Sequence, residues 1–309
     1  MSKVFETIPW VEKYRPNKFE DIVLDKYNKI LLENIIKQNN FPNLLFYGPP
    51  GTGKTTTIIN LIDKYQETYN QKNKGLKIHL NASDDRGIEV IRSQINQFVS
   101  TKNLFTNGTK FVILDEVDYM TKNAQQALRY LIQQYDNNVK FCLICNYISK
   151  IDYALQNEFI RLRFCQLPTK DITKFLTNII KNEKLSISKN QIKSIQNQFK
   201  SDIRSMINFI QSQSDIDFNN NIISESFFTD FFTKIENEKN VKQHILDVCN
   251  EKCIRINTFI IQFIAYLISN KSYMVNNSFL SKMKFIVHNN NINYNYLINF
   301  FSGELEKLL

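Results

Sequence analysis

The sequence has few of the residues that interrupt regular structure. Only seven of its 309 residues are glycine and six are proline. All six prolines lie in the first 168 residues, and a single glycine, Gly303, follows Pro168. Because long helices tolerate neither residue well, we expect an α/β first half with tight turns and a second half that is almost entirely helical.

Cysteine is also scarce and gives no disulfide framework. The five cysteines are an odd number without paired spacing, as expected for a reducing compartment. Cys142 and Cys145 have the spacing of a metal-binding CxxC, but they fall in a strand-like run, where residues three apart point to opposite faces. We therefore expect both in the core and predict no zinc site.

Long apolar runs are absent as well. The longest, from Phe259 to Ile268, is interrupted by Gln262 and is far shorter than the roughly 20 residues that span a bilayer. The first ten residues contain no apolar signal segment, so we expect a soluble, intracellular protein without a membrane partner. The formal charge of +9 favours polyanionic partners, nucleic acid first, although lysines on solvated faces explain the same excess equally well.

Short apolar runs alternate with helical patterns in the first half, an order that predicts a parallel sheet covered by helices on both faces. The expected strands are Asn43–Tyr47, Leu76–Asn81, Lys110–Asp115, Val139–Cys145 and Leu162–Cys165. The expected helices of this half are Lys26–Asn39, Lys54–Tyr69, Ile88–Val99 and Ala124–Tyr135.

Three domains are predicted from this pattern: an α/β domain over residues 1–166, a helical lid over residues 167–222 and a further helical domain over residues 223–309. Three helical patterns fall within Asp171–Gln213, and Asn219–Asn221 is a polar break. The expected helices after this break are Val241–Asn250, Ile256–Ser269, Ser278–His288 and Tyr294–Leu308.

Three of the seven glycines fall within six positions and belong to one motif. The phosphate-binding pattern GxxxxGK[ST] is fitted completely by Gly48-Pro49-Pro50-Gly51-Thr52-Gly53-Lys54-Thr55, between a strand and a helix. Backbone N–H groups of such a loop cradle phosphate oxygens. We expect Lys54 to reach the β and γ phosphates of ATP, Thr55 to bind Mg²⁺, and Thr56 to complete the ATP contacts.

Acidic residues end a second strand. The run Phe111–Leu114 is followed by Asp115 and Glu116, at the edge of the sheet where phosphates bind. Asp115 can hold Mg²⁺, and Glu116 can orient or deprotonate the attacking water. A third strand ends in Asn146, which can position the same water. For Asp118, helix capping is an equally good explanation.

Two longer signatures make the family recognisable. The residues PWVEKYRP, from Pro9 to Pro16, and LNASDDRG, from Leu80 to Gly87, resemble signatures of clamp loader subunits. LDEVDYM, AQQALRYLI and ICNY resemble the Walker B element, the following helix and sensor 1 of that family, and SDIRSMIN resembles its sensor 2. From about Pro9 to Gln211 the chain therefore resembles the small subunits of replication factor C, clamp loaders of the AAA+ ATPase family.

The resemblance implies a five-stranded AAA+ domain, a helical lid and a helical collar that holds five subunits in a ring, here a hetero-pentamer. It implies that ATP binding opens a sliding clamp and engages primer–template DNA, and that hydrolysis releases the closed clamp, in the nucleus or another site of DNA replication. By position, Arg204 is the sensor 2 arginine, which touches the γ-phosphate. Tyr14, Arg15 and Pro16 would line the adenine pocket.

One stretch departs from the family. Its small subunits carry Ser-Arg-Cys before the last AAA+ strand, and the arginine reaches into the neighbouring subunit's ATP site. Here Asn157, Glu158 and Phe159 occupy these positions, and a carboxylate cannot stabilise transition-state charge. Since arginine fingers contribute ~10³–10⁵-fold in related phosphoryl transfer, we expect this subunit to bind ATP but to activate its neighbour poorly. The alternative is that Arg161 acts as a displaced finger.

The expected DNA contacts follow Asn81. Arg86 and Arg92 lie at the start of the helix Gly87–Val99, whose first N–H groups can also meet a phosphate. Such contacts are independent of sequence and sensitive to salt. Two other functions stay open: a subunit that holds ATP in the ring but hydrolyses little of it, and another AAA+ DNA-remodelling ATPase, such as a branch-migration motor or an initiator.

Overall fold

The computed structural model describes residues 8–71, 73–83, 87–101, 108–135, 139–212, 225–238, 240–252, 254–288 and 293–308, with only the backbone at residues 74, 87–92, 225 and 226. The chain divides into two compact units, Met1–Ile187 with Ile195–Ser214 and Ser188–Ser194 with Asp215–Leu309. The first unit holds the whole sheet together with helices α7 (Thr169–Asn182) and α9 (Ile203–Ser212). The predicted domain boundaries at residues 166 and 222 are a different division, and they stay predictions.

The first unit is built on a five-stranded parallel sheet. Its strands are β1 (Leu44–Tyr47), β2 (Lys77–Asn81), β3 (Lys110–Asp115), β4 (Val139–Cys145) and β5 (Ile160–Arg163). They lie in the order β2-β3-β4-β1-β5, and every pairing is parallel. The predicted fold class, a parallel α/β sheet followed by helices, is confirmed.

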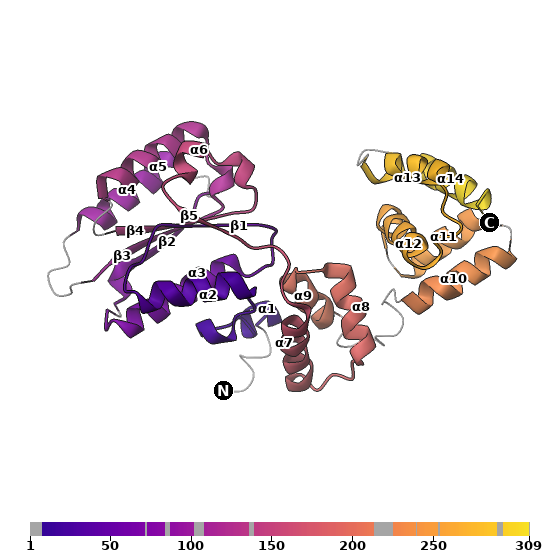
Figure 1. Ribbon diagram of the computed structural model, residues 1–309, viewed down its shortest axis with the longest axis horizontal. Helices are drawn as coiled ribbons and strands as arrows, with labels where there is room; N and C mark the ends of the chain where they lie inside the picture. The colour runs from indigo at the N-terminus through magenta and orange to yellow at the C-terminus, as the bar shows by residue number, and fades with distance from the viewer. Residues whose placement is uncertain are drawn as a thin grey trace. The chain divides into compact units, whose positions relative to one another are not determined.

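Helices cover both faces of this sheet (Figure 1). The helices that cover it are α2 (Lys26–Lys37), α3 (Lys54–Thr68), α4 (Gly87–Ser100), α5 (Lys122–Tyr135) and α6 (Tyr153–Gln156). Ile113 and Cys142 belong to the core on the side of α2 and α3, whereas Leu114 and Cys145 belong to the core on the side of α4, α5 and α6. Cys142 and Cys145 therefore point to opposite faces, as predicted, and burial raises the pKa of both thiols.

The ends of several predicted elements shift by one or two residues, and the short helices α1 (Trp10–Lys13) and α6 were not predicted. Strand β5 begins at Ile160, two residues before the predicted Leu162–Cys165, because the N–H of Ile160 donates to the carbonyl of Asn43 and pairing with β1 starts there. Helix α10 (Glu225–Asn237) was not predicted as an element of its own. Its buried residues Phe228, Phe231, Phe232 and Ile235 do have the helical spacing i, i+3, i+4 and i+7, so the sequence contained the signal for this helix.

The second unit is helical in its described part, as the scarcity of glycine and proline predicts. It contains α10 and the helices α11 (Val241–Glu251), α12 (Ile256–Asn270), α13 (Asn277–His288) and α14 (Tyr294–Glu306). Phe259, Phe263 and Phe301 are fully buried in its core. No single helix among the described residues is long and apolar enough to cross a bilayer, and α11 and α12 meet that requirement only together, with a bend of 115°.

Candidate nucleotide-binding site

The loop between β1 and α3 has a backbone that glycine adopts most readily. Gly48, Gly51 and Gly53 have φ angles of 140°, 72° and 84°, a region that other residues rarely adopt. A Cβ atom on Gly48 would lie 1.8 Å from the carbonyl oxygen of Phe164, and one on Gly51 would lie 1.8 Å from Oδ1 of Asp202. A Cβ atom on Gly53 would meet nothing within 4 Å. Gly48 and Gly51 are therefore required by close packing as well as by their φ angles.

Lys54, the first residue of α3, holds this loop together. Its side chain is buried, and Nζ donates to the carbonyl oxygens of Gly48 and Pro49, both at 2.8 Å, and to Oδ1 of Asn146 at 2.9 Å. Burial lowers the pKa of Lys54, and the nearby Asp115 carboxylate opposes this change. The ammonium group thus links the phosphate-binding loop to the end of β4.

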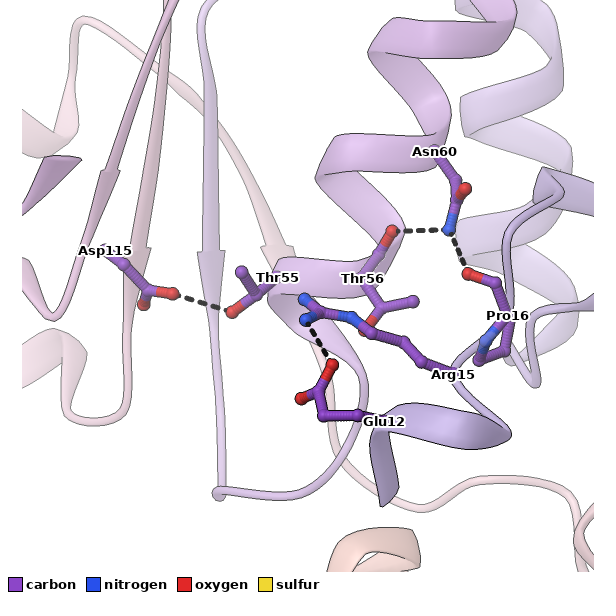
Figure 2. Close-up of polar contacts among 7 residues, drawn as sticks. All are labelled: Glu12, Arg15, Pro16, Thr55, Thr56, Asn60 and Asp115. Carbon is purple, nitrogen blue, oxygen red and sulfur yellow. Dashed lines mark hydrogen bonds and ion pairs between the residues drawn. The ribbon is translucent and has the colours of Figure 1, made fainter. Parts of the chain in front are cut away.

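Thr55 and Asp115 bring two oxygen atoms together beside Lys54. The Thr55 hydroxyl donates to Oδ2 of Asp115 at 2.7 Å (Figure 2). Hydroxyl and carboxylate oxygens are ligands that Mg²⁺ accepts, so these side chains fit the predicted metal. The next residue, Glu116, has a φ angle of 56°, and its N–H donates to Oδ1 of Asp115 at 2.9 Å.

These residues surround one cavity of about 240 Å³. Of the predicted site residues, the cavity is lined by Tyr14, Arg15, Pro50, Gly51, Thr52, Gly53, Lys54, Thr55, Thr56, Asp115, Glu116, Asn146 and Arg204. Pro16, Val23 and Phe175 add apolar surface. Gly48 and Pro49 take part through the carbonyls that accept from Lys54. The predicted site is therefore assembled in one place, although the role of each residue stays a prediction.

The N-terminal segment is fastened to helix α3 at the rim of this cavity (Figure 2). Nε of Arg15 donates to the Thr56 hydroxyl at 3.2 Å. Nδ2 of Asn60 donates to the carbonyl oxygens of Pro16 at 2.8 Å and of Thr56 at 3.0 Å. Arg15 and Pro16 thus lie beside the phosphate-binding helix, as the predicted adenine pocket requires.

The same N-terminal segment also contacts the end of α7 and helix α9, the lid helices. These contacts were not predicted from the sequence. Nζ of Lys13 lies 2.5 Å from Oε1 of Glu183, and the Tyr14 hydroxyl donates to the same oxygen. The N–H of Trp10 donates to Oε1 of Gln211 at 2.9 Å. Burial and the Glu183 carboxylate raise the pKa of Tyr14. Neither Glu183 nor Gln211 stands in a recognisable motif, so no local pattern predicts these contacts.

Gln125, in α5, was likewise not predicted. It is almost fully buried, and its Nε2 donates to the carbonyl oxygens of Met120 and Lys150, both at 3.1 Å. Its Oε1 accepts from the N–H of Asp152 at 2.7 Å. Gln125 thus joins the segments that follow β3 and β4, and only the family resemblance of AQQALRYLI singles it out.

Glu158, at the position where the family has its arginine, is engaged within the chain. Its Oε1 accepts from Nε of Arg129 at 3.2 Å and from Nε2 of Gln133 at 2.8 Å, both on α5. Arg161, on β5, donates from Nη1 to Oε1 of Gln156 at 3.3 Å.

The predicted DNA-binding residues are only partly within the described part of the chain. Arg86 lies outside the described residues, and Arg92 is described only by its backbone, in helix α4. Their role stays a prediction.

Comparison with known proteins gives consistent matches. Residues 44–167 match the family described as "ATPase family associated with various cellular activities (AAA)". The chain is 45% identical over 206 residues to replication factor C subunit 3 of Schizosaccharomyces pombe, which covers 67% of this chain and 59% of that protein. It is 43% identical over 206 residues to replication factor C subunit 5 of Homo sapiens, which covers 66% of this chain and 60% of that protein. The chain thus spans about three-fifths of the length of these curated relatives.

The sheet order, the phosphate-binding loop and the family match agree on one class: residues 44–167, which hold the whole sheet and this loop, are similar to the AAA family of ATPases. Within this class it is similar to replication factor C subunits of fungi and animals. The resemblance that its signatures indicate is therefore confirmed.

Gly51→Ala is expected to destabilise the protein more than Gly53→Ala. Both changes place a side chain at a positive φ, which costs about 1–2 kcal/mol, but only at Gly51 does the new Cβ meet Asp202. Thermal denaturation of the full chain without nucleotide should give the lower melting temperature for Gly51→Ala. Equal melting temperatures would show that Asp202 moves aside at no cost.

Proposed function

We propose that the chain is an ATP-binding and ATP-hydrolysing subunit of a clamp loader that places a sliding clamp on primer–template DNA during replication. The observation that carries this proposal is the convergence of the phosphate-binding loop, two strand ends and the lid on one cavity. Lys54, Asp115, Glu116, Asn146 and Arg204 all line it. The similarity to replication factor C subunits supplies the context of clamp loading.

Nucleotide binding falls to the residues at the start of α3. Lys54 would exchange its contacts with Gly48 and Pro49 for oxygens of the β and γ phosphates, since an ammonium prefers charged acceptors. The backbone N–H groups of the loop and of the first turn of α3 face the same phosphates. Thr55 and Asp115 would hold Mg²⁺, which when bound neutralises charge on the phosphates.

Three residues from separate elements would take part in hydrolysis. Glu116, after β3, orients or deprotonates the attacking water, a role usually worth ~10²–10⁴-fold. Asn146, after β4, positions the same water. Arg204 approaches from α9 and contacts the γ-phosphate, so that the lid responds to the nucleotide state.

The proposed partners are the other subunits of a hetero-pentameric ring, the sliding clamp and primer–template DNA. The charge of the chain supports a polyanion contact by its first part. Residues 215–309 contain nine Lys and Arg against ten Asp and Glu, which leaves thirty against twenty in residues 1–214. The cationic excess therefore lies entirely with the ATPase part, where DNA phosphates would be bound.

A second candidate function is a subunit that holds ATP in the ring and hydrolyses little of it. The departure at Glu158 raises this candidate, because a ring in which this edge supplies no cation would hydrolyse less ATP, and the site directly affected would be the neighbour's. The cavity residues Lys54, Asp115 and Glu116 favour the first candidate. Single-turnover hydrolysis at this subunit's own site, within the assembled ring, separates the two.

Lys54→Ala should abolish measurable ATP binding, because it removes the main cation facing the β and γ phosphates. Glu116→Gln is the matched control: it should retain ATP binding and slow hydrolysis. Fluorescent-nucleotide titration measures the first effect and ATPase assay of the full complex the second. Binding by Lys54→Ala at the wild-type level would refute the site. Unchanged hydrolysis in Glu116→Gln would mean that Glu116 is not the base or that the site is already silent.

Arg86→Ala combined with Arg92→Ala should weaken binding of primer–template DNA without changing sequence preference. Because fewer phosphates are neutralised, the dependence of affinity on salt should also flatten, by about one unit of slope for each arginine removed from a phosphate. Arg255→Ala with Lys284→Ala, both exposed in the helical second unit, is the matched control and should leave binding unchanged. An unchanged salt slope in the first variant would move the DNA surface elsewhere.

Glu158→Ala in the assembled complex should leave the clamp-stimulated ATPase nearly unchanged, because the carboxylate pairs within its own chain. Arg161→Ala should also have little effect, since Arg161 contacts Gln156 on the same subunit. Gel filtration confirms that each variant still assembles. A hundredfold loss of ATPase in Arg161→Ala, with assembly intact, would instead identify Arg161 as a displaced arginine finger.

A further inference from the structure

Asp118 is a buried carboxylate directly behind the nucleotide site. It lies in the short helix η4 (Val117–Tyr119) and is 6% exposed. Its Oδ1 accepts from the backbone N–H of Asn146 at 3.4 Å, and its Oδ2 has no hydrogen-bond partner within the described part of the chain. Burying a carboxylate with one oxygen unpaired costs free energy, so the presence of Asp118 calls for a specific reason.

Helix capping does not supply that reason. The N-cap residue of η4 is Glu116, and no side chain caps this helix. The hydrogen bond that the Asp118 side chain accepts comes instead from Asn146, 28 residues further along the chain. Asp118 therefore connects the segment after β3 to the end of β4.

Asn146 is held on two sides as a result. Its backbone N–H donates to Asp118, and its side-chain Oδ1 accepts from Nζ of Lys54 at 2.9 Å. The phosphates of ATP would compete with Asn146 for Lys54. They would not compete for the hydrogen bond between Asn146 and Asp118. Among the described residues, Asn146 lines the cavity and Asp118 does not.

We propose that Asp118 is a positioning residue for ATP hydrolysis, which keeps the backbone of Asn146 in place so that its side chain stays directed at the attacking water. This inference rests on the proposed function, because it assigns Asp118 a task at the same site. Asp118 does not line the cavity, so in this proposal it acts through Asn146. It should therefore affect the hydrolysis step and leave ATP affinity nearly unchanged.

The test compares single-turnover hydrolysis and ATP affinity in the complex of the full chain with its co-purified subunits. Asp118→Ala should slow hydrolysis about tenfold, the lower end of the effect of removing a supporting hydrogen bond, and change ATP affinity less than about threefold. Asp118→Leu, which fills the same space without an acceptor, should behave alike if the alanine variant folds poorly. Asp118→Asn should restore hydrolysis, because its amide oxygen can accept the same N–H.

A double-mutant cycle separates positioning from general destabilisation. Asp118→Ala with Asn146→Ala should hydrolyse ATP no more slowly than Asn146→Ala alone, because residues that act as one unit are not additive. Gln66→Ala is the matched control: Gln66 is buried in α3, so its truncation leaves a cavity that should lower the melting temperature and leave hydrolysis unchanged.

Additive rates in the double variant, or an Asp118→Asn variant as slow as Asp118→Ala, would overturn the proposal. Wild-type hydrolysis in the Asp118→Leu variant would do the same. A wild-type complex in which this chain neither binds nor hydrolyses ATP would overturn the proposed function itself, and this result is visible before any variant is made.

Discussion

The buried ammonium group of Lys54 is the constraint on which the site depends. A cation that is 7% exposed needs acceptors on every side, and they come from the loop carbonyls of Gly48 and Pro49 and from the side chain of Asn146. These acceptors meet only because β4 and β1 are neighbours in the sheet. Strand β3, on the other side of β4, brings Asp115 and Glu116 to the same edge. The strand order therefore decides which side chains can act together.

The central strands could be predicted from the sequence because they are buried on both faces. Lys110–Asp115 and Val139–Cys145 are observed with the predicted bounds, since a continuous apolar run bounded by polar residues leaves little choice. The edge strand β5 could not be placed as well. Ile160, Arg161 and Arg163 are exposed, so its start depends on a hydrogen bond to Asn43, which is remote in sequence.

In the candidate site, too, local patterns could be predicted from the sequence and contacts between remote residues could not. The phosphate-binding loop, Asp115 and Glu116 are local patterns with a mechanism of their own, and the structure places them around one cavity. The contacts of Glu183 with Lys13 and Tyr14, and of Asp202 with Gly51, join residues more than 140 positions apart. No periodicity or spacing predicts such pairs, because each depends on how the lid helices pack against the N-terminal segment or the phosphate-binding loop.

The change at Glu158 shows how a departure at one position is balanced at another. A free carboxylate on an edge that faces a nucleotide would repel the phosphates. Here Glu158 accepts from Arg129 and Gln133, both on α5, so its charge is paired within the chain. Because this pair is partly exposed, it adds little to stability. Its main effect is that this position presents a paired carboxylate where the family places a cation. In the proposed ring that difference would affect the neighbour's catalysis, whereas Glu158 does not line this chain's own cavity.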